Sequence, residues 1–244
     1  MRLLSYNIHK GIGGRDRRYR LDRVIEVIEL ENPDLMCLQE VGQHARRSRS
    51  DDQAKLLIEY FHAVGFLYQR NFRRGFGGYG NLVLSRWPLA GHHQISLRWG
   101  ERKPRGAQLV VIESPEGPLH VVNCHLGLAE AERHWQVGHL LAHPLFAASA
   151  HLPTLIAGDT NDWRNTLAHG PFAEHGFQTS TAPPSRFRTF PAWLALGALD
   201  KAFHRGGITV LHARVVSNSL ARRASDHLPV VVDFHLRDAS PAAF

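Results

Sequence analysis

The sequence predicts an α/β fold in which two mixed β-sheets carry helices on their outer faces. Two observations support this prediction. Three segments have apolar residues at helical spacing, and a longer series of short apolar runs has the length of β-strands. The strands come in closely spaced pairs with the helices interspersed among them, which favours mixed sheets.

Each of the three expected helices carries a stripe of mostly apolar residues, three or four positions apart, on one face. These residues are Leu21, Val24, Ile25 and Ile28 in the first helix, Leu57, Tyr60, Phe61 and Val64 in the second, and His134, Val137 and Leu141 in the third. Asn32-Pro33 ends the first helix, Asp51-Asp52 opens the second, and the third runs from about Ala129 to before Pro144.

Strands are expected at residues 2–8, 34–39, 66–70, 81–86, 92–98, 106–113, 118–124, 154–158, 208–216 and 229–236. The two cysteines, Cys37 and Cys124, fall inside two of these apolar runs. We therefore expect free buried thiols and no disulfide framework.

Acidic, amide and imidazole residues recur where the apolar runs begin or end. They are Asn7, Gln39-Glu40, Asn81, Asn123, His125, Asp159, Asn161, Asp162, Asp200 and Ser225-Asp226-His227. Each one alone is consistent with a polar turn after a strand. Because binding and catalytic groups gather on loops at one end of a sheet, their recurrence predicts a site assembled from both ends of the chain.

This series resembles the endonuclease/exonuclease/phosphatase superfamily over nearly the whole chain, in the family's order. The superfamily includes DNase I, exonuclease III-type nucleases, neutral sphingomyelinases and inositol polyphosphate 5-phosphatases. Asn-x-His-Lys-Gly near the start, His-Leu-Gly-Leu and Gly-Asp-x-Asn-Asp-Trp look most like a bacterial branch that includes the YbhP family. The resemblance implies a DNase I-like four-layered sandwich, with two mixed sheets between layers of helices.

The resemblance also implies hydrolysis of a phosphoester with the help of a divalent metal ion. It makes Glu40 and Asn7 ligands of Mg²⁺, with Mn²⁺ as the alternative, and Asp226 a further ligand or an anchor behind the ion. Several nucleases of the superfamily carry Asp two residues after the first Asn. Here that position is His9, so one tightly held ion is expected.

The remaining implied roles concern the reacting phosphate. Asp159 would orient or deprotonate the attacking water, and Asn161 would bind a phosphoryl oxygen. The spacing of these two residues places both side chains on the same side of an extended segment, because side chains alternate along a strand.

Four further site residues follow from the resemblance. His227 would contact the phosphoryl group while Asp200 fixes its tautomer; whether His227 is a base or a charged stabiliser stays open. His125 would protonate or stabilise the leaving group. Asn81 would support the phosphate pocket. Four more residues, for which a structural role is at least as good an interpretation, are His9, Arg105, Asp162 and Trp163.

The chain carries a formal net charge of +7, and of its 29 basic residues only Lys10, Lys55, Lys103 and Lys201 are lysines. Arginine grips phosphate through a planar fork of donors, so this bias suits a phosphate-rich partner. DNA is the favoured substrate. A phospholipid headgroup or a small phosphorylated metabolite is the alternative substrate, and a non-catalytic binding module is the alternative to an enzyme. The charge itself is equally consistent with a solvated surface of arginine-rich background composition.

The chain has 244 residues, of which 43% are hydrophobic, and it contains no Ser/Gly-rich or Pro-rich linker. We expect one domain over residues 1–237 and a short tail over residues 238–244. The first expected strand begins too early for a signal peptide, and no apolar run approaches the roughly 18 residues that span a membrane. A cytoplasmic location is therefore expected.

Overall fold

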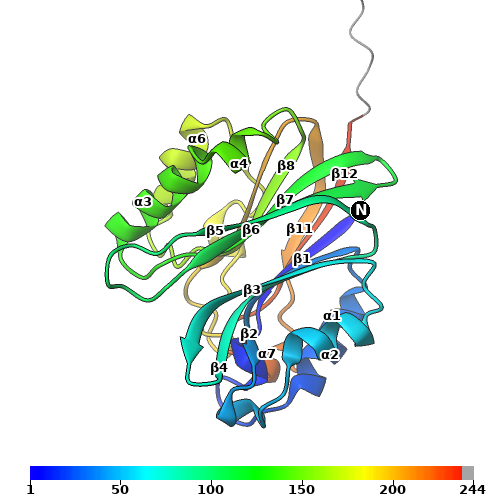
Figure 1. Ribbon diagram of the computed structural model, residues 1–244, viewed down its shortest axis with the longest axis vertical. Helices are drawn as coiled ribbons and strands as arrows, with labels where there is room; N and C mark the ends of the chain where they lie inside the picture. Colours follow the sequence, from blue (N-terminus) through cyan, green and yellow to red (C-terminus); the bar gives the residue numbers. More distant parts are fainter. Residues whose placement is uncertain (238–244) are drawn as a thin grey trace, which may run out of the picture.

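The computed structural model describes residues 1–237, so the expected tail lies outside the described residues. Two six-stranded sheets form the centre of the molecule (Figure 1). The first sheet has the order β11 (Ile208–Val215), β12 (Val230–Leu236), β1 (Arg2–Asn7), β2 (Leu35–Gln43), β4 (Gly77–Ser85) and β3 (Gly65–Arg74). The second has the order β5 (Leu89–Ser96), β6 (Gly106–Ser114), β7 (Gly117–His125), β8 (Thr154–Asp159), β10 (Asp200–Arg205) and β9 (Gln178–Thr179).

Helices cover the outer face of each sheet, as Figure 1 shows. On the first sheet lie α1 (Leu21–Glu31), α2 (Gln53–Tyr60) and α7 (Ala221–Ala224). On the second lie α3 (Glu130–Leu141), α4 (Pro144–Ala147), α5 (Thr166–His169) and α6 (Pro171–Glu174). Three 3₁₀ turns complete the order: η1 (His9–Gly11), η2 (Arg46–Ser48) and η3 (Pro184–Arg186). The predicted two mixed sheets flanked by helices are confirmed.

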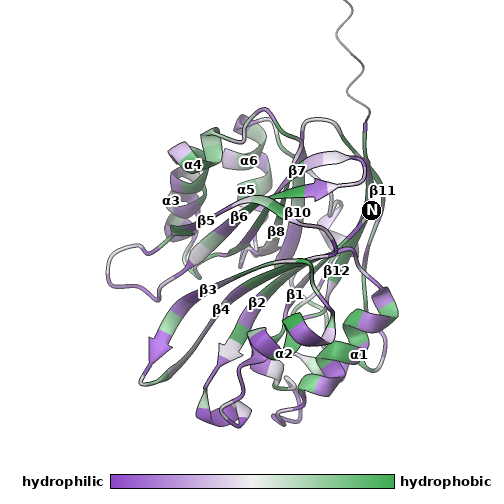
Figure 2. Cartoon of the chain, turned by 45° about the vertical axis from the view of Figure 1, so that its right-hand side comes forward, coloured by the Kyte–Doolittle hydropathy of each residue, from purple (hydrophilic) through white to green (hydrophobic). Residues whose placement is uncertain are grey.

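The core has three layers because neighbouring strand residues point to opposite faces of a sheet. Leu3 packs between the two sheets, while Leu4 packs beneath α1 together with Val24. Val121 and Val122 divide in the same way between the central layer and the layer under α3. Burial on both faces explains why the strands read as continuous apolar runs, and the hydrophobic colour on the central strands in Figure 2 follows them.

Each sheet contains one parallel pair of neighbouring strands near its centre, and these pairs align the strand ends. Strands β1 and β2 are parallel, with Asn7 opposite Gln39. Strands β7 and β8 are parallel, with His125 opposite Asp159. Strand β10 runs antiparallel to β8, so its first residue, Asp200, lies opposite Asp159.

Two predictions of secondary structure were wrong. Val64 was expected on the apolar face of the second helix, but α2 ends at Tyr60 and Val64 is 60% exposed in the turn that follows. Asp200 was expected to follow a strand, whereas it begins β10. Strand β10 was missed because its sequence holds only Ala202 and Phe203 as apolar residues, and its neighbours supply the rest of its buried surroundings.

The cysteine prediction is confirmed, since Cys37 and Cys124 are free and buried. Within residues 1–237, none of the helices combines the length and the apolar character needed to cross a bilayer.

Candidate active site

The polar strand ends meet at one edge of the two sheets. Asn7 ends β1, His125 ends β7 and Asp159 ends β8. Asp200 joins them from β10, because that strand starts where β8 stops. His227 arrives from the segment that precedes β12 and lies within 3.7 Å of Asp159. The edge therefore gathers residues from both ends of the chain, from Asn7 near the start to His227 near the end.

Asp159 is the centre of this group and is 1% exposed. Its Oδ2 accepts a hydrogen bond from Nδ2 of Asn7 at 3.0 Å and lies 3.3 Å from Nε2 of His125 and 3.7 Å from Nε2 of His227. Burial disfavours the charged carboxylate and raises the pKa of Asp159 to about 6, although the nearby His227 partly opposes the shift.

His227 is held by two neighbours on the side away from Asp159. Its Nδ1 lies 2.7 Å from Oδ2 of Asp200, and its backbone N–H donates to Oγ of Ser225 at 3.3 Å. Burial opposes protonation of the ring, but the carboxylates of Asp200 and Asp159 outweigh burial and raise the pKa of His227 far above its usual value. The ring is therefore an imidazolium at neutral pH.

His125 has the opposite protonation state. Burial, reinforced by the positive charge of Arg105, lowers its pKa well below the usual value. Arg105 Nη1 lies 3.2 Å from Nδ1 of His125 and, because a guanidinium can only donate, Nδ1 is the acceptor. The single ring proton is then on Nε2, which faces Asp159.

Arg105, for which a structural role was an equally good interpretation of the sequence, has a buried side chain that is 6% exposed. Asn81 lies beneath the same turn, where its Nδ2 donates to the carbonyl oxygen of Gly106 at 3.0 Å. Asn81 is 1% exposed, so it supports the turn that carries Arg105. No local sequence signal separates Arg105 from the exposed neighbours Arg102 and Lys103.

The geometry expected for Asn161 was wrong. The segment after β8 is not extended, because Asn161 has a φ of 50°, in the left-handed region. Its N–H donates to Oδ1 of Asp159 at 3.0 Å, which forms an Asx turn, and its Nδ2 donates to the carbonyl oxygen of Leu126 at 3.0 Å. Asn161 therefore lies beside Asp159 because the chain turns there, and not because side chains alternate along a strand.

Glu40 also departs from its expected position directly after a strand. Strand β2 continues to Gln43, and Glu40 lies at a bulge where the pairing with β4 shifts between Leu38 and Val41. Its φ of 53° belongs to the left-handed region, which non-glycine residues adopt rarely. Such bulges redirect a side chain out of the regular alternation, and the redirected Glu40 carboxylate, which is 13% exposed, reaches Lys10.

Glu40 offers a hard, ionised oxygen for a cation. Burial opposes its charge, but the ammonium of Lys10, which hydrogen-bonds to Oε2, outweighs burial and holds the pKa of Glu40 well below its usual range. Within residues 1–237, Oε1 has no hydrogen-bond partner. Asn7 and Asp226, the other two predicted metal ligands, both contact His9. Its backbone N–H donates to Oδ1 of Asn7 at 3.1 Å, and its Nδ1 lies 3.6 Å from Oδ1 of Asp226.

A second group could also hold a metal ion. Ligand atoms of Asp159, Asp200 and His227 lie within 4.8 Å of one another, and Oδ1 of Asp200 is buried without a partner in the described part of the chain. In this group Nδ1 of His227 is already engaged by Asp200 and Oδ2 of Asp159 by the amide of Asn7. The free oxygen of Glu40 fits a divalent cation better.

Gln39 and Asn123, which belong to two of the family-like motifs, tie the two sheets together below the site. Gln39 Nε2 donates to Oδ1 of Asn123 at 2.8 Å. Asn123 Nδ2 donates in turn to the carbonyl oxygen of Leu38 and to Oε1 of Gln108. Both residues are fully buried, so their role is to fix the spacing between the strands that carry Glu40 and His125.

Sequence analysis missed two cations and an aromatic ring beside Glu40. Nζ of Lys10 lies 4.8 Å from the ring centre of Tyr79, and Nζ of Lys103 lies 5.2 Å from it. Lys10 belongs to the Asn-x-His-Lys-Gly motif, whose lysine is the one signal that could have pointed to it.

Two six-stranded sheets with an acid–imidazole site at one shared edge define a phosphoesterase of the DNase I-like class. The family model described as "Endonuclease/Exonuclease/phosphatase family" matches residues 4–227, and the chain belongs to this family. Its members are hydrolytic phosphoesterases that generally depend on a divalent metal ion.

Comparison with individual proteins gives the same result. The chain is 29% identical over 248 aligned positions to the uncharacterized protein YbhP of Escherichia coli K12, and the match covers 96% of both proteins. An endonuclease/exonuclease/phosphatase structure from Beutenbergia cavernae is similar with a TM-score of 0.79 and 22% identity, over 100% of this chain and 73% of that one. A mannosyl-6-phosphatase from Bacteroides thetaiotaomicron has a TM-score of 0.71 and 17% identity, over 96% of this chain and 99% of that one.

Proposed function

We propose that this protein is a divalent-metal-dependent phosphodiesterase that cleaves DNA by attack of water on phosphorus. One observation carries the proposal. The buried carboxylate of Asp159 lies between two imidazoles of opposite protonation state, His125 and His227, at the edge that also holds the ionised Glu40. A base, two hydrogen-bond donors and a cation position are therefore assembled around a single point.

Asp159 acts as the base in this proposal. A general base works best when its pKa lies near the working pH, and burial raises the pKa of Asp159 to about 6. The hydrogen bond from Asn7 to Oδ2 and that from the N–H of Asn161 to Oδ1 fix the orientation of the carboxylate toward an attacking water.

The two histidines divide the remaining work. The imidazolium of His227 stabilises negative charge that develops on a phosphoryl oxygen, and Asp200 keeps it charged and oriented. His125 donates a hydrogen bond from Nε2 to the leaving oxygen. It does not give up this proton, because a neutral imidazole that loses its only ring proton would become an anion. The leaving alkoxide, stabilised by this hydrogen bond, takes its proton from solvent water.

Glu40 would hold the metal ion, with the Asn7 amide and Asp226 as further ligands. Mg²⁺ is the proposed ion and Mn²⁺ the alternative, in a single site. When bound, such an ion neutralises charge on the phosphoryl oxygens and helps to position them.

DNA is the proposed substrate because the charge of +7 resides mainly on arginines, which bind phosphate bidentately. A phosphatase or phosphodiesterase acting on a phospholipid headgroup or a small phosphorylated metabolite is the second candidate. The similarity in fold to a mannosyl-6-phosphatase favours a small monoester among these.

One panel of substrates tests the proposal. Plasmid DNA, single-stranded DNA, bis-p-nitrophenyl phosphate, p-nitrophenyl phosphate and anionic phospholipids are incubated with Mg²⁺, with Mn²⁺ or with EDTA. Nicked plasmid and hydrolysed diester that require the metal and are lost in Asp159→Asn are the expected result. Hydrolysis of the monoester alone would contradict the proposal and support the phosphatase alternative.

A further inference from the structure

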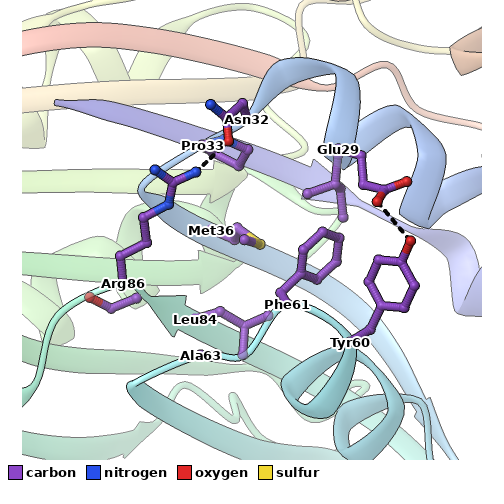
Figure 3. A pocket seen from close by; sticks show the side chains of 11 residues that line it. Glu29, Asn32, Pro33, Met36, Tyr60, Phe61, Ala63, Leu84 and Arg86 are labelled. Carbon is purple, nitrogen blue, oxygen red and sulfur yellow. Dashed lines mark hydrogen bonds between the residues drawn. The ribbon is translucent and has the colours of Figure 1, made fainter.

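Two hollows in the surface lie outside the group formed by Asp159, His125 and His227, and they differ in the polar groups that they offer a ligand. The first, shown in Figure 3, has a volume of about 280 Å³ and lies between α1, α2 and the end of β4. Its polar groups satisfy one another: the hydroxyl of Tyr60 donates to Glu29 at 2.7 Å, and Arg86 donates to Asn32. This hollow presents no unpartnered charge to a ligand.

The second hollow is larger and adjoins the candidate active site. Its volume is about 780 Å³, and it lies between the far end of the β3–β4 hairpin and the segment that follows β2. The two walls are close at their base, where Gln43 pairs with Gly78. Lys10 and Tyr79 form its inner end, and the same Lys10 ammonium bonds to Glu40. We call this hollow the hairpin pocket.

The charge of the hairpin pocket is of one sign. Lys10, Arg46, Arg47 and Arg74 line it, and no Asp or Glu does. Across residues 1–237, neither a salt bridge nor a side-chain hydrogen bond involves any of the three arginines. Arg20, by contrast, is neutralised by Asp22 at 2.6 Å. The hydrophilic colour at the end of β3 in Figure 2 marks this region.

The rest of the pocket wall is aromatic and apolar. The rings of Phe72 and Tyr79 lie 5.2 Å apart at an interplanar angle of 33°. Phe76, at the tip of the hairpin, is 99% exposed, although a large apolar side chain is costly to leave in water. Unpaired arginines beside aromatic rings form the combination that binds a planar base together with its phosphate.

We propose that the hairpin pocket binds a nucleotide unit next to the scissile phosphate, with its base against Phe76 and Phe72 and its phosphate on Arg46, Arg47 and Arg74. This proposal deepens the proposed function and rests on it. The volume falls in the range of pockets that enclose a nucleotide-sized ligand, roughly 300–1,000 Å³. Continuity through Lys10 places the bound unit directly beside Glu40.

Binding and turnover are measured separately. Binding of fluorescein-labelled decathymidylate is followed by anisotropy in EDTA, where hydrolysis by a metal-dependent enzyme does not occur. Arg46→Ala/Arg47→Ala is expected to weaken binding about tenfold through loss of phosphate contacts. Phe76→Ala is expected to weaken it by a similar factor of about ten through loss of base stacking. Hydrolysis of bis-p-nitrophenyl phosphate, which is too small to reach the pocket, is expected to stay unchanged.

Matched controls remove the same groups elsewhere. Arg186→Ala/Arg188→Ala deletes two exposed arginines that do not line the pocket, and Phe66→Ala deletes a half-exposed phenylalanine at the other end of β3. Both controls are expected to bind decathymidylate as the unaltered protein does. Equal losses of affinity in the controls and the pocket variants would overturn the proposal. They would show that binding depends on the overall positive charge or on exposed aromatic surface anywhere on the protein.

The outcomes also separate this proposal from the proposed function. Cleavage of DNA that is indifferent to the pocket variants would overturn the pocket and keep the nuclease. Pocket-dependent binding of decathymidylate without cleavage would keep the pocket and overturn the nuclease. If the protein bound anionic phospholipid vesicles through Phe76 and had no affinity for decathymidylate, the nucleotide site would be overturned in favour of a lipid site.

Discussion

Nδ1 of His227 lies 2.7 Å from Oδ2 of Asp200, so a residue that precedes β12 in the first sheet is held by a residue that begins β10 in the second. The pair bridges the two sheets at the edge that carries the candidate site. It also explains why the ring is charged: the Asp200 carboxylate, with Asp159 on the other side, offsets the cost of burying an imidazolium.

The bridge predicts that His227 and Asp200 act as one unit. We expect His227→Ala to lower turnover by about a hundredfold or more, because charge stabilisation in a dry site contributes at least that much. Asp200→Asn should cost less. The double variant should be little worse than His227→Ala alone, since groups that act together are not additive. The measurement is kcat on bis-p-nitrophenyl phosphate. If the loss in the double variant equals the product of the two single losses, Asp200 has an independent role, such as that of a metal ligand.

Asp159→Asn should lower turnover about a hundredfold or more, through loss of the base, while leaving decathymidylate binding intact. The same change should make the protein more stable at pH 7. The ionised carboxylate is held at a cost in the folded state, and each kcal/mol recovered shifts the unfolding midpoint of a domain of this size by about 2–4 °C. The gain should shrink as the pH falls below about 6, where Asp159 is already neutral. A midpoint that falls at pH 7 would show that the charge of Asp159 stabilises the fold.

The pH dependence of turnover follows from the same residue. A carboxyl group with a raised pKa stays protonated up to higher pH, so the base form of Asp159 is lost as the pH falls through about 6. We expect kcat to fall about tenfold per pH unit below that value. Circular dichroism over the same range controls for unfolding. A profile that stays flat down to pH 4 would exclude Asp159 as the base.

Glu40→Gln should weaken Mg²⁺ binding strongly, because it removes the ionised oxygen that fits a hard cation. Titration calorimetry measures this without any need for activity. Glu113→Gln, an exposed glutamate on β6, is the matched control and should bind Mg²⁺ as before. If Glu40→Gln retains full affinity, the group formed by Asp159, Asp200 and His227 becomes the metal site instead.

Much of the site could be predicted from local sequence because each residue sits at a strand end. Asn7, His125 and Asp159 each end an apolar run. The run predicts a β-strand, and the end of the strand predicts that the side chain lies at the edge of the sheet. Asp200 was placed in the site although β10 was not recognised, because the family-like motif identified it where the apolar pattern could not.

Other features depend on conformations that no local pattern marks. The bulge that redirects Glu40 toward Lys10 arises from the pairing of β2 with β4, some forty residues further along the chain. The left-handed φ of Asn161 excludes the extended segment that strand alternation predicted, and an Asx turn takes its place. The burial of Arg105 could not be distinguished from the exposure of Arg102, because both belong to the same basic cluster.

By itself, the sequence determined the class of fold, the three longest helices and the residue types at the edge that carries the candidate site, because strand and helix periodicity and the polar ends of apolar runs are local properties. Only the tertiary structure decided which charges these residues carry. The proton on His227, its absence from Nδ1 of His125 and the raised pKa of Asp159 depend on burial and on the distances between segments far apart in the chain. Electrostatic energy depends on separation and surroundings in space, which residue order does not contain.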